Sequence, residues 1–135
     1  MITPLIGAAI RRNEDPRLLR GLGCFVADVT PAGLLHAAGL RSPHARARIR
    51  SVDASRARAH RGVRLVLTAA DLGPLNQPTP LLIPHPELTH PRTPLPLAAE
   101  DVRYSGELVA LVVADDRYLA EDAARLIDEI GRAHV

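Results

Sequence analysis

The sequence contains few aromatic and few sulfur-containing residues. Its 135 residues include no tryptophan, two tyrosines, one phenylalanine, one methionine and one cysteine. Because aromatic residues make up only 2% of the chain, its core must be built from leucine, valine, isoleucine and alanine. The single cysteine, Cys24, excludes an internal disulfide and is typical of a protein in a reducing compartment.

Long apolar runs and a strong charge imbalance are also absent. The longest apolar runs are much shorter than the roughly 20 residues that a membrane-spanning helix needs. The apolar residues at the N-terminus precede Arg11 and Arg12, which is the reverse of the order in a secretory signal. The net charge of +2 is too small to indicate a polyanionic partner by itself. We therefore expect a cytoplasmic protein that binds neither membranes nor nucleic acid.

The residues that are present fit one globular domain interrupted by a proline-rich stretch. Hydrophobic residues make up 47% and charged residues 24%, ordinary values for a folded protein. A chain of this length buries about two-thirds of its unfolded surface. Most of the twelve prolines lie in residues 73–97, where each fixes φ and removes a backbone donor. This spacing excludes a helix or a central strand and predicts a long Pro-rich excursion.

Four segments have the residue patterns of strands. Residues 34–41 form an apolar run between a glycine and a Ser-Pro corner, which predicts a buried strand. Arginines then alternate with smaller or apolar residues over 46–52, as in a strand with one solvent-exposed face. A third strand is predicted over 63–67, and residues 107–114 are apolar on both faces and therefore central. We expect strands 34–41 and 107–114 to be adjacent.

Capping signals predict three helices. Asp53 is a good N-cap for a short helix over 54–61. Because this helix lies between two predicted strands, we expect it to form a crossover connection that packs on their sheet. Residues 68–71 resemble a capping box that opens a single turn. Asp115 and Asp116 together predict the cap of an amphipathic helix that runs from Arg117 to about Glu129.

Several of these segments, taken in order, resemble a known family. They are Gly-Leu-Leu-His-Ala-Ala at 33–38, Arg-Ser-Pro-His-Ala-x-Ala-Arg-Ile at 41–49 and Val-Arg-Tyr-x-Gly-Glu-x-Val-Ala at 102–110. The chain resembles the N-terminal α/β-hammerhead domain of molybdenum hydroxylase large subunits, the catalytic chains of the xanthine dehydrogenase, aldehyde oxidase and aerobic carbon monoxide dehydrogenase superfamily. The resemblance implies an α+β fold, with a hammerhead-like mixed sheet, a C-terminal amphipathic helix and the Pro-rich excursion.

The resemblance also implies a role and a set of cofactors. The chain would be the N-terminal fragment of a catalytic subunit that carries molybdenum-molybdopterin in its cytosine dinucleotide form, and the fragment alone would be inactive. Electrons would leave through FAD and 2Fe-2S groups on partner subunits or domains, an FAD-binding medium subunit and a 2Fe-2S small subunit, within a higher oligomer. The metal-site residues of the family lie in later domains. We therefore expect no catalytic, cofactor-binding or metal-binding residue in this chain.

Three features resemble functional sites but have simpler structural interpretations. Cys24 has no identifiable histidine and acid partners, so we interpret it as a small packed residue. Glu107 follows a glycine at the start of a strand, which favours backbone capping or an interface over a role as catalytic acid. Three potential metal ligands lie among prolines that hold their side chains on no regular face, so we interpret them as exposed loop residues: His85, Glu87 and His90.

Arginine is concentrated in residues 41–64. A nucleic-acid surface is one interpretation, but this stretch has no stacking aromatics, and Asp53 and Asp71 interrupt or follow it. We favour a solvated face, and an intersubunit salt-bridge surface is a third interpretation. The arginines concerned are Arg41, Arg46, Arg48, Arg50, Arg56, Arg58, Arg61 and Arg64.

We expect three parts along the chain. Residues 1–28 form an N-terminal segment, residues 29–130 form the hammerhead domain with its Pro-rich loop at 73–97, and residues 131–135 form a non-native tail, since they resemble translated adapter DNA. Two other functions remain open: a freestanding protein-interaction module and an arginine-mediated nucleic-acid binder. Co-purification of flavin and iron–sulfur proteins would favour the enzyme subunit over both.

Overall fold

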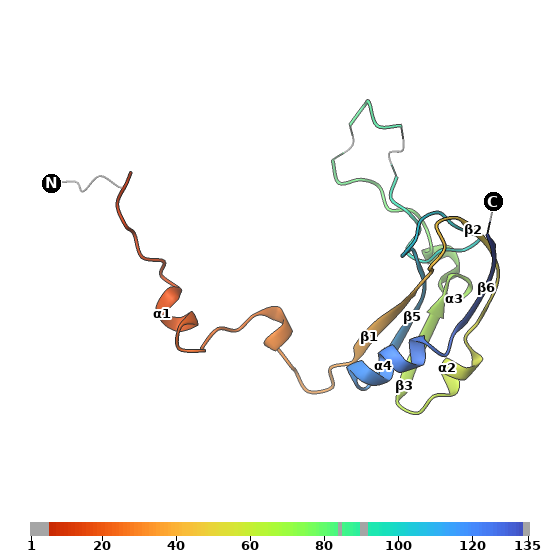
Figure 1. Ribbon diagram of the computed structural model, residues 1–135, viewed down its shortest axis with the longest axis horizontal. Coiled ribbons are helices and arrows are strands. Elements are labelled where there is room, and N and C mark those ends of the chain that lie inside the picture. The colour runs from red at the N-terminus through yellow and green to blue at the C-terminus, as the bar shows by residue number, and fades with distance from the viewer. Residues whose placement is uncertain (1–5, 84, 90–91, 134–135) are drawn as a thin grey trace. The chain divides into compact units, whose positions relative to one another are not determined.

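The computed structural model describes residues 6–83, 85–89 and 92–133, and the chain divides into two compact units after Leu34 (Figure 1). The described part of the first unit contains the short helix α1 (Asp15–Leu18) and the 3-10 turn η1 (Val26–Asp28). Neither element buries a residue, and Phe25 beside η1 is 67% exposed. None of the described helices has the length and apolar character needed to cross a bilayer.

The second unit contains two three-stranded sheets, with the strand orders β1-β5-β3 and β4-β2-β6. Every neighbouring pair of strands that is described in these sheets is antiparallel. The single mixed sheet that we expected is therefore wrong, because β2 and β3 belong to separate sheets and no parallel crossover joins them. The strands are β1 (His36–Arg41), β2 (Ala47–Asp53), β3 (Val63–Thr68), β4 (Asp101–Val102), β5 (Leu108–Ala114) and β6 (Asp128–Ala133).

Strand β5 lies at the centre of the first sheet. It pairs with β1, in the register His36↔Ala114 to Arg41↔Leu108, and with β3 on its other side. The expected adjacency of strands 34–41 and 107–114 is therefore confirmed. The prediction that 34–41 is buried is wrong, since β1 is an edge strand whose residues alternate between half-buried and exposed.

Two helices cover one face of the first sheet. Helix α4 (Arg117–Ala124) lies across β1 and β5, and α2 (Ser55–Ala59) contacts both β3 and α4 (Figure 1). The core between them contains Ala57, Val66 and Val112, so it is built largely from alanine and valine. Because α2 connects strands of two different sheets, the expected crossover on one sheet is wrong.

The C-terminal helix is shorter than predicted. Asp116 caps α4 as expected, and its carboxylate accepts hydrogen bonds from the backbone N–H groups of Tyr118 and Leu119. The helix ends at Ala124 rather than near Glu129, because the following residues form β6 and pair with β2. This pairing satisfies backbone groups that a longer helix would have bonded within itself.

The remaining helices follow β3. The capping box at Thr68 is present, with Asp71 Oδ2 accepting hydrogen bonds from Thr68 N and Oγ1 at 2.8 and 2.6 Å, and it opens α3 (Ala69–Leu72). The turn η2 (Gly73–Leu75) continues into the proline-rich residues.

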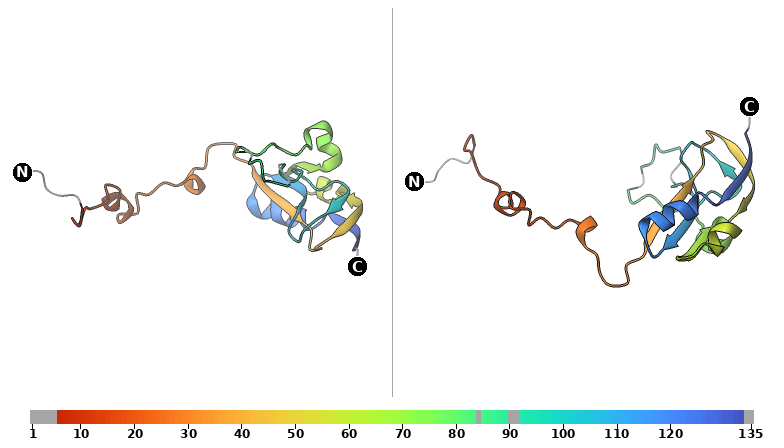
Figure 2. Two further views of the ribbon diagram at one scale, coloured as in Figure 1. Left: turned by 90° about the horizontal axis from the view of Figure 1, so that it is seen from above. Right: turned by 60° about the horizontal axis from the view of Figure 1, so that its bottom comes forward.

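The described parts of 73–97 contain no strand of the two sheets (Figure 2). An isolated bridge joins Pro80 to Arg92, and at the base Asn76 forms two hydrogen bonds with the backbone of Leu97, at 2.9 and 3.0 Å.

Candidate functional site

Residues 41–44 and 103–107, here called the polar junction, bring together two of the segments that the sequence singled out. Ser42 N donates to Glu107 O at 2.9 Å, and Gly106 N donates to Ser42 O at 2.8 Å. Gly106 has a φ of +92°, a conformation that glycine adopts without strain. The corner after β1 is therefore bonded to the bend before β5.

Glu107 is the largest polar side chain buried in the polar junction, with only 1% of its surface exposed. Its Oε2 accepts from Arg103 N at 2.6 Å, and its Oε1 accepts from Arg103 Nε and Nη2 at 3.0 and 2.5 Å. Both carboxylate oxygens thus have donors from one residue four positions earlier. This is the backbone-capping role that we predicted, reinforced by an ion pair.

Ser42 is a buried residue that the sequence analysis did not identify. It is 1% exposed, its hydroxyl donates to Glu129 Oε1 at 2.8 Å, and its Oγ accepts from His44 N at 3.3 Å. Because Glu129 comes from β6, this bond joins the polar junction to the second sheet. The sequence shows a small hydroxyl residue between an apolar run and a proline, which is compatible with a buried corner. Its bonding partner could not be predicted, because Glu129 lies 87 residues away.

The outer rim of the polar junction is also bonded to backbone groups. Arg41 Nη1 donates to Gly106 O at 2.8 Å, and Ser105 Oγ donates to Pro43 O at 3.3 Å. These bonds hold two chain corners together.

The basic residues are dispersed over the second unit and partly paired. Arg58 and Arg64 bind Asp71 and Asp115 at 2.7 and 2.6 Å. The hydrogen bonds from Thr68, followed by the nearby Arg58, hold the pKa of Asp71 below its usual value. The hydrogen bond and charge of Asp115 raise the pKa of Arg64.

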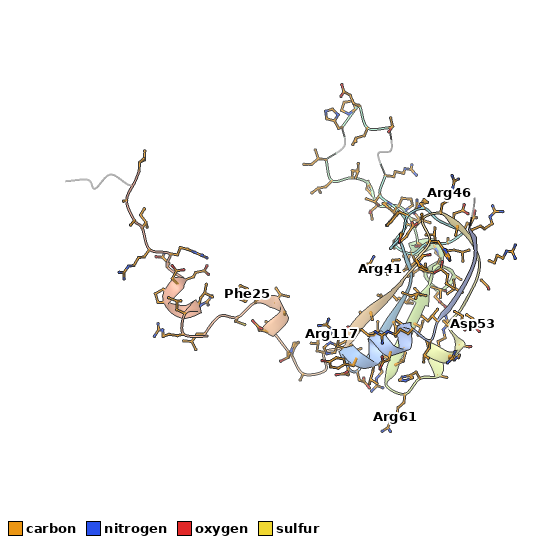
Figure 3. The ribbon with its side chains drawn as sticks, in the orientation of Figure 1. Phe25, Arg41, Arg46, Asp53, Arg61 and Arg117 are labelled. Carbon is orange, nitrogen blue, oxygen red and sulfur yellow. The ribbon has the colours of Figure 1, made fainter. Side chains whose placement is uncertain are left out.

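Other basic residues face different directions. Arg46 and Arg61 lie at opposite ends of the second unit (Figure 3). Arg48 pairs with Asp101 at 3.8 Å. This dispersion and pairing favour the interpretation of a solvated face.

The other sequence candidates lie apart from the polar junction. Cys24 belongs to the first unit and is exposed, so our interpretation of it as a packed residue is wrong. His85 and Glu87 are exposed, whereas His90 lies outside the described residues. Within the described ranges, no three histidine, cysteine or acidic residues are grouped as metal ligands.

The comparison with protein families gives a clear assignment. Residues 20–129 match the model of the aldehyde oxidase and xanthine dehydrogenase a/b hammerhead domain. The chain belongs to this family. The matched region contains the polar junction, the sheet β1-β5-β3 and strands β2 and β4, and it ends within β6.

Two curated relatives are large subunits of oxidoreductases. The carbon monoxide dehydrogenase large chain of Afipia carboxidovorans is 45% identical over 123 residues, which are 91% of this chain and 14% of the relative. The nicotine 6-hydroxylase large subunit of Paenarthrobacter nicotinovorans is 43% identical over 129 residues, 91% of this chain and 15% of the relative. The chain therefore spans about one-seventh of the length of these relatives.

Solved structures share the hammerhead fold. Quinoline 2-oxidoreductase from Pseudomonas putida 86 matches with a TM-score of 0.85 and 42% identity, over 96% of this chain and 16% of that chain. Aldehyde oxidoreductase from Desulfovibrio gigas matches with a TM-score of 0.80 and 29% identity, over 92% of this chain and 14% of that chain.

The described residues do not fit a molybdenum-pterin cofactor. The three buried polar side chains, Ser42, Thr68 and Glu107, each have hydrogen-bond partners within the chain. The hollow beside Arg58 and Arg64 is lined by the carboxylate of Asp71. His60 Nδ1 is buried without a hydrogen-bond partner, but no three potential metal ligands are grouped within the described ranges. We therefore derive no chemical step from these residues.

Proposed function

We propose that this chain is the N-terminal part of the catalytic large subunit of a molybdenum-dependent oxidoreductase, of the xanthine dehydrogenase, aldehyde oxidase or carbon monoxide dehydrogenase type. Its role there is structural: it supports the cofactor domains and contacts other subunits. Similarity to two large subunits supports the enzyme class. The satisfied polar junction supports a structural role, since its buried groups are used to hold the fold together.

The observation that carries the subunit-contact role is the exposure of large apolar side chains. In the first unit Leu19, Val26 and Leu22 are 87%, 92% and 60% exposed. A monomeric soluble protein rarely leaves so much apolar surface uncovered, and such surfaces usually mark protein contacts. Under this proposal, other parts of the large subunit and its partners cover these residues.

The proposal includes cofactors and partners outside this chain. The complete protein would carry molybdenum-molybdopterin, in the cytosine dinucleotide form, in later domains and would act in the cytoplasm. FAD would reside on a medium subunit and 2Fe-2S on a small subunit, within a higher oligomer. None of the residues of this chain would be catalytic or bind these groups.

The proposed division of the chain keeps residues 1–28 as an N-terminal segment and residues 29–130 as the hammerhead domain. The last strand of that domain, β6, continues to Ala133, where it pairs with Ala47 of β2.

A chimeric enzyme tests the proposed function. Residues 20–129 replace the matching segment of the carbon monoxide dehydrogenase large chain of Afipia carboxidovorans, which is expressed with the other proteins of its operon. We expect the tagged chimera to co-purify with flavin and iron–sulfur proteins and to contain molybdenum. A folded chimera that purifies alone would favour a freestanding interaction module instead.

A further inference from the structure

The first sheet, β1-β5-β3, has one covered face. Because side chains alternate along a strand, each strand contributes every second residue to this face. Those residues belong to the core that also contains Ala57 of α2 and Ala123 of α4. The side chains on the covered face are Ala38, Leu40, Val66, Ala110 and Val112.

The opposite side chains of the same strands form a second apolar surface, here called the open face. Leu65 is 47% exposed, and Leu111 and Val113 on the central strand are only half-buried. A Cβ at Gly39 would overlap Leu108 Cδ1, so the Leu108 side chain lies over that glycine on the same face. The open face consists of Ala37, Leu65, Leu67, Leu108, Leu111 and Val113.

The open face carries one charged side chain among the described residues. Arg41 alternates with Ala37 and pairs with Leu108, so it stands on this face at the end of β1, where its guanidinium donates to Gly106 O. Arg64 at the β3 side is bonded to Asp115 by two hydrogen bonds, at 2.6 and 2.9 Å. A partner on this face therefore meets mainly aliphatic carbon with one cation at the edge, whereas a phosphate backbone is recognised by several cations.

We infer that the open face docks against the polypeptide that follows the hammerhead domain within the same large subunit. This inference rests on the proposed function. An aliphatic surface on a central strand needs a permanent cover, as in an obligate interface. About 85% of the length of each of these two relatives lies outside the segment that this chain matches, and that polypeptide belongs to the same chain as the segment.

The inference is tested by measuring whether the full 135-residue chain binds a separate large chain that lacks the matching segment. The probe is the carbon monoxide dehydrogenase large chain of Afipia carboxidovorans, produced without the segment that this chain matches. Titration calorimetry compares the wild-type chain with Ala37→Glu and Leu65→Glu, two exposed positions on the open face. We expect each substitution to weaken binding at least about 30-fold, the effect of losing one interface hot spot.

Matched controls place the same glutamate elsewhere. Leu75 is 78% exposed and Tyr118 on α4 is 74% exposed, and neither belongs to the open face. Leu75→Glu and Tyr118→Glu should change the affinity less than about two-fold, within the range of surface substitutions. Circular dichroism melts of all four variants verify that each remains folded.

Three outcomes would overturn the inference. The first is that the wild-type chain does not bind the probe. The second is that the open-face and control variants lose the same affinity. The third is that the wild-type chain forms a dimer which Leu65→Glu dissociates, because a second copy would then occupy the open face.

Leu65→Glu in the chimera distinguishes this inference from the proposed function. A variant chimera that still assembles with full molybdenum content refutes the docking face and leaves the proposed function intact.

Discussion

Glu107 is a buried carboxylate whose hydrogen bonds stabilise the fold. An ionised carboxylate in a protein interior costs several kcal/mol unless donors surround it. Arg103 supplies three such donors, one from its backbone and two from its guanidinium, and its side chain remains 50% exposed. The guanidinium thus stays partly hydrated while it neutralises the buried charge.

We expect Glu107→Ala to lower the free energy of unfolding by about 3 kcal/mol, because the substitution leaves a cavity and removes the partner of a buried backbone N–H. Arg103 can turn to water, so the loss stays below that of a fully buried unpaired charge. Urea denaturation measures the change. Glu87→Ala, at an exposed loop position, is the control and should change stability by less than about 0.5 kcal/mol.

Asp71 should make stability depend on pH. Hydrogen bonds from Thr68 and the charge of Arg58 lower the pKa of Asp71 in the folded chain, so folding favours its ionised form. This contribution is complete above the unfolded pKa of about 4 and is lost as pH falls through the lower folded pKa. At pH 7, Asp71→Asn should cost about 1 kcal/mol, the value of a capping interaction.

The pH dependence of this cost provides the decisive comparison. The difference in unfolding free energy between wild type and Asp71→Asn should shrink as pH falls below about 4, and urea denaturation at several pH values measures it. Asp122→Asn, with an exposed carboxylate on α4, is the control. A cost of Asp71→Asn that is constant from pH 7 to pH 3 would contradict the assignment.

Among the strands, β5 has two faces with different surroundings. Val112 is fully buried against α2 and α4, whereas its neighbour Val113 is half-buried on the open face. Val112→Ala should lower the free energy of unfolding by about 2 kcal/mol through lost burial and a cavity. Val113→Ala should cost less than about 1 kcal/mol in the isolated chain, because its methyl groups already contact water.

These two variants make the same substitution at adjacent positions of one strand, so thermal or urea unfolding compares the faces directly. Equal losses would indicate that both faces are covered in the isolated chain. In the chimera, docking of the open face should raise the cost of Val113→Ala towards that of Val112→Ala.

The charge distribution of the whole chain bears on the nucleic-acid alternative. Arg48, Arg58 and Arg64 are paired with aspartates, while Arg46 and Arg61 lie far apart (Figure 3). We expect binding to a DNA duplex no tighter than the roughly 10⁻⁵ M of non-specific complexes, as measured by fluorescence anisotropy. Nanomolar affinity with a steep salt dependence would instead support an arginine-mediated nucleic-acid binder.

Metal analysis distinguishes the chain alone from the complete enzyme. Ser42 and Glu107 have hydrogen-bond partners within the chain, and no three histidine, cysteine or acidic residues among the described ones are grouped as metal ligands. We expect the isolated chain, purified from molybdenum-replete cells, to contain no stoichiometric molybdenum by mass spectrometry, whereas the chimera contains it. Bound molybdenum in the isolated chain would contradict the structural role proposed for it.

Local patterns were sufficient for several parts of the fold. Residues 68–71 form the predicted capping box, Asp116 caps α4, and the apolar run at 107–114 is the central strand. The capping role of Glu107 also followed from its place after a glycine. In each case the residues that interact lie within a few positions of one another, or the pattern reports burial of a single strand.

Tertiary contacts alone decided the remainder. The residues after Ala124 continue a helical pattern, but they become β6 because β2 offers backbone partners 75 to 86 residues earlier in the chain. The same pairing brings Glu129 to the hydroxyl of Ser42 and separates the strands into two sheets. Strand pairing depends on groups that are distant in sequence, so residue periodicity did not show that 128–133 would form a strand or that the strands would divide between two sheets.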